Sequence, residues 1–168
     1  MKVLWAPWRM EYILSEKEGS ACIFCPGENR DQDRDRLILF VGRLSMVIMN
    51  RFPYINGHLL VAPVRHVPDL VSLSDEESLD ILKTVRKSVE ILKREMSPEG
   101  FNVGLNMGKV AGAGMESHMH FHVVPRWNGD HNCMTVLGDV RVIPEHIKAT
   151  YERLLPHFKG FNKYGGEE

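Results

Sequence analysis

The stretch Ser117-His118-Met119-His120-Phe121-His122-Val123-Val124 carries three histidines at a spacing of two residues, with apolar residues between them. Because successive side chains of a β-strand point to opposite faces, this alternation predicts a strand with its histidines on one face and apolar residues on the other. A single histidine on a strand is usually an ordinary surface residue. Three in register on one short strand indicate a site.

The spacing also predicts that the three histidines have different partners. At about 3.3 Å per strand residue, the Cα atoms of His118 and His122 lie roughly 13 Å apart. One metal ion cannot readily bind three imidazoles spread over that distance. The sequence therefore favours a divided arrangement, in which an outer histidine binds something else and the middle one, His120, faces a substrate.

Length and composition predict one soluble globular domain. The chain has 168 residues, of which 43% are apolar and 26% are charged, as in an ordinary folded domain. A formal net charge of -1 gives no electrostatic case for binding nucleic acid or a membrane surface. The N-terminus has no signal-peptide core, and no apolar run approaches the roughly 20 residues that span a bilayer. We therefore expect a cytoplasmic protein.

The three cysteines predict metal or redox chemistry rather than a disulfide framework, because their number is odd and two of them form a Cys-x-x-Cys pair. Cys22 and Cys25 are followed by Pro26-Gly27, a pattern typical of a tight knuckle that presents two thiolates to one ion. Two reduced, packed cysteines are the alternative. Cys133 stands alone and is expected to be a small core or surface residue.

One long amphipathic helix is expected over residues 75–96. Ser74 and Glu77 form a capping box at its start. Apolar residues then recur at helical spacing and are expected to cover one face of a sheet: Leu79, Leu82, Val85, Val89, Leu92 and Met96. A second helix is expected over residues 144–158, with Pro144 in its first turn.

Four short β-prone runs are expected as further strands: residues 37–41, 45–50, 58–62 and 101–106. Gly42-Arg43 between the first two predicts a hairpin. The glycine-rich segment 108–114 leads directly into the histidine strand. Glycines let a backbone approach a ligand closely and aim its N–H groups at an anion, so this segment is a candidate phosphate-binding loop.

Residues 118–124 read His-φ-His-φ-His-φ-φ, where φ is apolar, and other motif residues accompany them: Asn50-Arg51, Gly57-His58-Leu59, Asn106, the glycine loop and Pro125-Arg126. This combination resembles the histidine triad (HIT) superfamily of nucleotidyl hydrolases and transferases over about residues 22–127. The segments 4–9 and 125–130 are similar to its bacterial and archaeal branch, which is associated with diadenosine tetraphosphate phosphorylase or hydrolase activity.

The resemblance implies an α+β fold, with an antiparallel sheet of about five strands packed by one long helix and a C-terminal helix, forming a homodimer. Residues 22–127 are then the catalytic domain. Residues 1–21 are expected as an N-terminal extension, and residues 128–168 as a C-terminal extension of the same domain.

The resemblance also implies residue roles. His120 is expected to attack the α-phosphorus of a nucleotide and form a covalent nucleotidyl-histidine, while His58 and His122 stabilise the phosphate oxygens. Many family members carry Gln followed by Ser or Thr before the triad, whereas this chain has Gly114-Met115-Glu116-Ser117, so Ser117 is expected to substitute in part. The expected nucleotide-binding residues are Asn50, at the ribose position, and Asn106, Gly112, Ala113, Gly114, Ser117 and His122.

Zinc-bearing relatives imply a metal site as well. The positions that match their ligands are Cys22, Cys25, His66 and His118, two thiolates and two imidazoles that suit a closed structural zinc site. Mg²⁺ is expected only as a counter-ion of the substrate.

Three other functions stay open at this point. The first is a Hint-type nucleoside phosphoramidate hydrolase, and the second is a nucleotidyltransferase acting on a sugar phosphate. The third is a zinc-stapled nucleotide sensor without turnover, for which substitution of His120 would leave biological activity intact. Hydrolysis and phosphorolysis also stay undecided, since both share every residue up to the second step.

Overall fold

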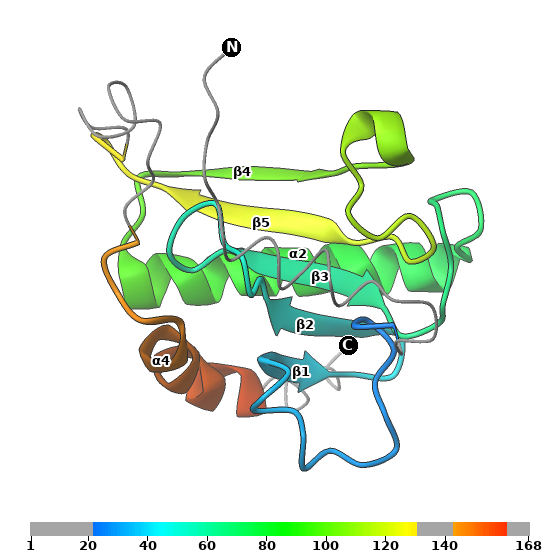
Figure 1. Ribbon diagram of the computed structural model, residues 1–168, viewed down its shortest axis with the longest axis horizontal. Coiled ribbons are helices and arrows are strands. Elements are labelled where there is room, and N and C mark those ends of the chain that lie inside the picture. The colour runs from blue at the N-terminus through cyan, green and yellow to red at the C-terminus, as the bar shows by residue number, and fades with distance from the viewer. Residues whose placement is uncertain (1–21, 131–142, 161–168) are drawn as a thin grey trace.

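The computed structural model describes residues 22–130 and 143–160, and its elements form a sheet flanked by two helices (Figure 1). The five strands are antiparallel to their neighbours and lie in the order β1-β2-β3-β5-β4, which confirms the predicted α+β fold. The long helix α2 runs behind the strands in this view. In chain order the elements are β1 (Ile38–Val41), β2 (Ser45–Met49), β3 (Leu59–Pro63), α2 (Asp75–Met96), β4 (Gly100–Leu105), the short 3-10 helix η1 (Lys109–Ala111), β5 (Phe121–Arg126) and α4 (Ile147–Lys159).

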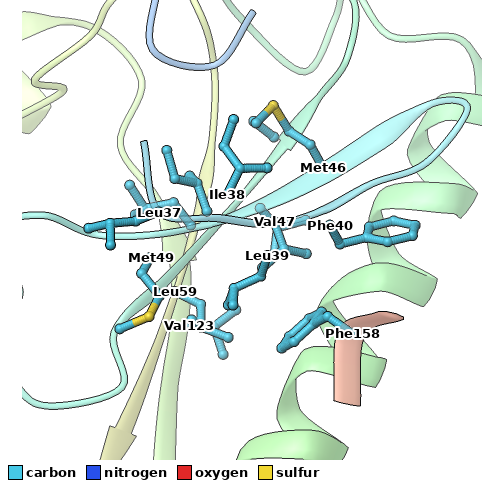
Figure 2. Close-up of a cluster of buried hydrophobic side chains, with 14 of the residues drawn as sticks. Leu37, Ile38, Leu39, Phe40, Met46, Val47, Met49, Leu59, Val123 and Phe158 are labelled. Atoms are coloured by element: carbon cyan, nitrogen blue, oxygen red, sulfur yellow. The ribbon is translucent and has the colours of Figure 1, made fainter. Parts of the chain in front are cut away.

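The core forms where β1, β2 and β3 are covered by the helices. Every residue of β2 and β3 is buried, and Phe158 of α4 belongs to the same buried cluster as side chains of β1, β2 and β5 (Figure 2). Tyr151 of α4 donates its hydroxyl to the Ile38 carbonyl at 3.0 Å. The sheet is therefore held rigidly at the strands that lead into the histidine region.

The C-terminal helix begins later than expected. Pro144 lies before it, and His146 is the N-cap residue, whose ring accepts a hydrogen bond from the Lys148 N–H at 3.2 Å. A proline does occur inside the helix, at Pro156. The helix still packs on β1 through buried Tyr151 and Leu154, so its predicted place in the fold holds although its start was wrong.

The apolar face predicted for α2 is wrong in its first turns. Leu79 and Leu82 are 55% and 58% exposed. The helix instead turns a mixed face to the sheet, where the Ser45 hydroxyl of β2 bonds to Asp80 at 2.5 Å and to Thr84 at 2.8 Å. A prediction from apolar periodicity counts only apolar residues. It therefore misses polar side chains that face the sheet and form hydrogen bonds across the interface. The buried residues are Glu77, Ile81, Thr84, Val85, Ser88, Ile91 and Leu92.

The capping box of α2 is confirmed and extended by an arginine. Glu77 accepts the Ser74 N–H at 2.8 Å and both Arg65 donors at 2.7 and 2.8 Å. The Arg65 hydrogen bond, followed by the bond from the Ser74 backbone, lowers the pKa of Glu77 to about 2. This carboxylate therefore stabilises the fold in its charged form.

We expect Glu77→Gln to lower the melting temperature at pH 7. Because the pKa of Glu77 is depressed in the folded state, its stabilisation is present above the ordinary value of 4.5 and is lost as the pH falls toward about 2. Thermal denaturation of both proteins between pH 7 and pH 3 measures the difference, which should shrink through that window. Glu76→Gln, which removes the exposed pair with Arg43, is the control and should change little. An equal effect of the two variants would contradict this account.

The histidine strand is shorter than predicted. The ladder between β3 and β5 ends at the Val61–Phe121 pair, so His118, Met119 and His120 precede β5 in an extended segment. There the Met119 N–H donates to the Val67 carbonyl at 2.8 Å. The segment leaves the sheet at that point, which brings its first histidine toward the loop after β3 and the cysteine knuckle.

Other predictions fall outside the part of the chain that the structure describes. These are the extension over residues 1–21 and the residue Cys133. Among the described helices, none is long and apolar enough to cross a bilayer.

Candidate active site and metal centre

Three histidine rings meet where β3 and β5 lie side by side. His58 precedes β3, His122 is in β5, and their ring centres are 5.2 Å apart. His120 lies 5.0 Å from His122 and contacts Phe24 of the cysteine knuckle on another side, with ring centres 4.5 Å apart. His118 points away from this group, toward the cysteines. The structure thus separates His118 from the other histidines, whereas the predicted role of His120 toward a substrate stays a prediction.

The ring of His120 is held with one nitrogen available. Its Nδ1 lies 3.1 Å from the His118 carbonyl oxygen, and because a carbonyl only accepts, Nδ1 must carry the proton. The neutral ring then has its lone pair on Nε2. Burial lowers the pKa of His120, which favours this neutral form. His120 is therefore prepared to act as a nucleophile.

His58 and His122 form a chain of directed hydrogen bonds. The Tyr54 N–H donates to Nδ1 of His58 at 3.2 Å, so the neutral ring of His58 carries its proton on Nε2. That nitrogen lies 3.0 Å from Nδ1 of His122, which must accept, so His122 carries its own proton on Nε2. The backbone of residue 54 thereby sets the tautomer of His122, which presents an N–H donor.

Both rings are neutral near pH 7. Burial, together with the neighbouring His122 and His120, lowers the pKa of His58 to about 3. Burial, followed by His120, lowers the pKa of His122 to about 4. His58 is fully buried and both its nitrogens have partners within the protein, so the role expected from the sequence, stabilising phosphate oxygens, stays a prediction.

The lowered pKa values predict an unusual pH profile. Protonation of His120 removes its free lone pair, and the pKa of that ring lies below the ordinary 6.5. We expect the rate of nucleotidyl transfer to His120 in a single turnover to fall on the acid side with a midpoint below pH 6.5. Rates measured by rapid quench between pH 8 and pH 4.5 define this acid side of the pH–rate profile. A midpoint at or above 6.5 would contradict the neutral, buried ring.

Cys22, Cys25, His66 and His118 come together as one cluster, as the sequence predicts. Their ligand atoms all lie within 4.8 Å of one another, with Nδ1 of His118 3.3 Å from Sγ of Cys22, and Nδ1 of His66 3.2 Å from Sγ of Cys25. A tetrahedral zinc ion with bonds of about 2.0 to 2.3 Å requires ligand atoms roughly 3.3 to 3.8 Å apart. The donor set and its spacing therefore fit zinc.

The orientation of the His118 ring also favours a metal at this cluster. Nε2 of His118 donates to the Pro63 carbonyl at 2.8 Å, which leaves Nδ1 unprotonated and facing the sulfurs. Burial and the adjacent Cys22 raise the pKa of Cys25 to about 11, a condition that a bound cation reverses by stabilising the thiolate. With four protein ligands the site is closed, so zinc would supply structure rather than chemistry.

The predicted nucleotide-binding residues around the histidines differ in their exposure and in their hydrogen-bond partners. Asn50 bonds through Nδ2 to Nδ1 of His58 at 3.2 Å, behind the rings. Asn106 follows β4 and lines the same cavity as His122, while its amide donates weakly to the Gly112 carbonyl at 3.4 Å. Ser117 is exposed and its hydroxyl contacts the Met115 sulfur at 3.7 Å.

The glycine loop is folded on itself. The N–H groups of Gly112 and Ala113 donate to the carbonyls of Lys109 and Gly108 at 3.0 and 3.3 Å. Phosphate binding by these two groups stays a prediction and requires these bonds to be exchanged. Gly114 has a partner of its own within the fold.

Sequence reasoning missed Phe24 and Tyr54 as parts of the site. Phe24 is buried against both His118 and His120, and its place inside the Cys-x-x-Cys pair was the available signal. Tyr54 contributes its backbone N–H to His58 and stacks its ring 5.9 Å from His122. No sequence pattern indicates a backbone donor in a loop.

The fold and the site define a class of α+β proteins in which a buried, neutral histidine with an unprotonated Nε2 lies beside a hydrogen-bonded pair of histidines. A sequence model of the HIT domain matches residues 32–129. The chain therefore belongs to the HIT family.

Named relatives support this assignment. The chain is 39% identical over 159 residues to an AP-4-A phosphorylase of Mycobacterium tuberculosis, covering 90% of this chain and 81% of that protein. It is 32% identical over 139 residues to an adenosine 5'-monophosphoramidase of Schizosaccharomyces pombe, covering 83% and 99%. These relatives are enzymes, and the prediction of a HIT-family enzyme is confirmed.

A solved structure shares the fold. It is a zinc-bound histidine triad family protein from Mycobacterium smegmatis, with a TM-score of 0.61 at 23% identity over 76% of this chain and 86% of that chain. At this identity the likeness concerns the fold.

Proposed function

We propose that this protein cleaves a phosphoanhydride bond of a dinucleoside polyphosphate, with diadenosine tetraphosphate as the favoured substrate. The observation that carries the proposal is the Nδ1–H bond from His120 to the His118 carbonyl, which leaves Nε2 of a buried imidazole unprotonated. The AP-4-A phosphorylase relative, which matches over most of both chains, supports the substrate class.

In the first step Nε2 of His120 attacks the α-phosphorus, and a bond forms between nitrogen and phosphorus. The bond from that phosphorus to its bridging oxygen breaks, and the electron pair leaves with the oxygen of the departing nucleotide. The Nδ1 proton stays on the ring, where the His118 carbonyl stabilises the positive imidazolium. The Nε2–H of His122 donates to a phosphate oxygen as charge develops.

In the second step an oxygen nucleophile attacks the same phosphorus and the bond to Nε2 breaks. Water gives AMP and releases a proton to solvent, whereas an oxygen of inorganic phosphate gives ADP. His120 returns to its neutral form in both cases. The choice between hydrolysis and phosphorolysis depends on which acceptor binds beside the nucleotidyl-histidine.

A single-turnover assay with diadenosine tetraphosphate, run with and without inorganic phosphate, tests this function. ADP formed only with phosphate would establish phosphorolysis, and AMP with ATP would establish hydrolysis. Mass spectrometry after rapid quench should show one AMP on His120. Turnover without such an adduct would refute the covalent route.

A phosphoramidate hydrolase is the second candidate. The S. pombe monophosphoramidase, aligned over 99% of its length, favours it. The same covalent step on His120 would then release an amine, which must take up a proton. Release of ammonia from adenosine 5'-phosphoramidate, at a higher kcat/KM than for diadenosine tetraphosphate, would support this function instead.

The remaining assignments belong to the same proposal. Zinc at the cysteine–histidine cluster is structural, Asn50 serves the ribose, and Mg²⁺ enters only with the substrate's phosphates. A homodimer is supported by β4, the last strand of the sheet, whose residues are largely exposed. We also expect a cytoplasmic location, and residues 22–127 as the catalytic domain.

A further inference from the structure

A cavity of about 380 Å³ lies beside the histidine site and has His122 on its wall. His122 is the only triad residue on its wall, and neither His120 nor Phe24 contributes. The cavity lies along β4 and β5, and the loop that carries Tyr54 forms another part of its wall. The wall includes Tyr54, Asn102, Gly104, His122, Arg126 and Asp130.

The cavity has room because of a glycine. Gly104 pairs with His122 across the two strands, and a Cβ at Gly104 would find no atom within 4 Å. Beside it the Tyr54 ring lies 5.9 Å from the His122 ring at an angle of 20°. The near end of the cavity therefore combines open space with aromatic surface, which suits a flat ring system.

The far end of the cavity is polar, and the positive charge there, on Arg126, is already paired with a carboxylate. Arg126 donates to both carboxylate oxygens of Asp130 at 2.5 and 2.9 Å and to the side-chain Oδ1 of Asn102 at 2.7 Å. An arginine held by a carboxylate is poorly suited to a phosphate. A neutral ligand with several hydrogen-bonding groups, such as a nucleoside, matches this end better than a polyphosphate does.

The length of the cavity agrees with this ligand. His122 and Arg126 are four strand residues apart, which corresponds to roughly 13 Å at about 3.3 Å per residue. A nucleoside extends over about 10 Å, and the volume falls within the range of about 300 to 1,000 Å³ for small-molecule sites.

We propose that this cavity binds the nucleoside of the leaving nucleotide, the one that departs when His120 attacks. The inference rests on the proposed function, in which the attacked phosphorus lies at Nε2 of His120. A phosphate chain that continues past the N–H donor of His122 enters the cavity next, so the far nucleoside occupies it. The cavity thus selects substrates whose leaving group carries a second nucleoside.

The test compares two substrates that share the transferred AMP but differ in leaving group: diadenosine tetraphosphate and adenosine 5'-phosphoramidate. Gly104→Val puts a side chain into the open space. We expect the ratio of kcat/KM for the first substrate over the second to fall by roughly tenfold or more. Gly104→Ala should lower the ratio less. If Gly104→Val does not fold, Gly104→Ala still provides the test.

Gly100→Val is the matched control. Gly100 lies on the same strand, a Cβ there also finds no atom within 4 Å, and it does not line the cavity. Its substrate ratio should stay close to that of the unaltered protein.

Two results would overturn the inference: an unchanged ratio in both Gly104 variants, or equal losses on both substrates, which would place the transferred nucleoside in the cavity. In either case the AMP adduct on His120 would still form and the proposed function would stand. Absence of that adduct in the unaltered protein, with either substrate, would refute the proposed function itself and this inference with it.

Discussion

Replacement of His120 by glycine is expected to lower kcat by at least about 10⁴-fold, because the variant lacks the nitrogen that forms the covalent bond. His120 is almost fully buried, and among the described residues its Nε2 is the prepared nucleophile on this face of the site. Steady-state kinetics and rapid-quench mass spectrometry measure the loss of turnover and of the AMP adduct. Binding of the nucleotide, followed by equilibrium dialysis, should persist.

Free imidazole provides the sharper control for this variant. The small space left by His120→Gly lies against Phe24, and added imidazole should restore part of the activity by acting in place of the missing ring. A surface change, His157→Gln on α4, should leave kcat unaltered. Persistence of the AMP adduct or of full turnover in His120→Gly would show that another residue is the nucleophile.

Removal of zinc is expected to destabilise the protein severely. The four ligands join the cysteine knuckle, the loop after β3 and the segment before β5, segments that are up to 96 residues apart along the chain. A structural zinc site contributes on the order of 10 kcal/mol of apparent folding free energy. In Cys22→Ser we therefore expect the loss of bound metal and a fall in melting temperature of more than about 10 °C.

Activity should fall together with the metal, because the two sites share a backbone. The ring of His118 belongs to the proposed zinc site, and its carbonyl accepts a hydrogen bond from Nδ1 of His120. Metal analysis, thermal denaturation and kcat measured on the same samples should change in parallel, whereas Cys133→Ser should retain zinc. Freshly purified protein without bound zinc, or a melting temperature unaffected by a strong chelator, would refute the structural site.

The position of His58 shows where sequence reasoning reaches its limit. The motif placed His58 near the phosphate, but only the fold shows that its ring is fully enclosed between the Tyr54 N–H and His122. The bond between His58 and His122 joins residues 64 positions apart. The tautomer of a histidine depends on such hydrogen-bond partners, and the neighbouring sequence does not reveal it.

Some features of this protein follow from the sequence alone, because they depend on neighbours within a few residues. These are the alternation that separates the roles of the histidines, the capping box at Ser74 and Glu77, the hairpin at Gly42-Arg43 and the Cys-x-x-Cys pair. Each is a local preference of backbone or side-chain geometry; the capping box and the hairpin were confirmed, the cysteine pair lies in the predicted cluster, and the roles of the histidines stay predictions.

Tertiary structure decided the rest. The exposed positions of Leu79 and Leu82 follow from the bonds that turn the polar side chains of α2 toward Ser45. The early end of the strand ladder at Phe121, the enclosure of His58 and the cavity above Gly104 arise in the same way. All of these depend on contacts between segments distant in the chain, whose packing is optimised jointly and cannot be assigned from any one segment.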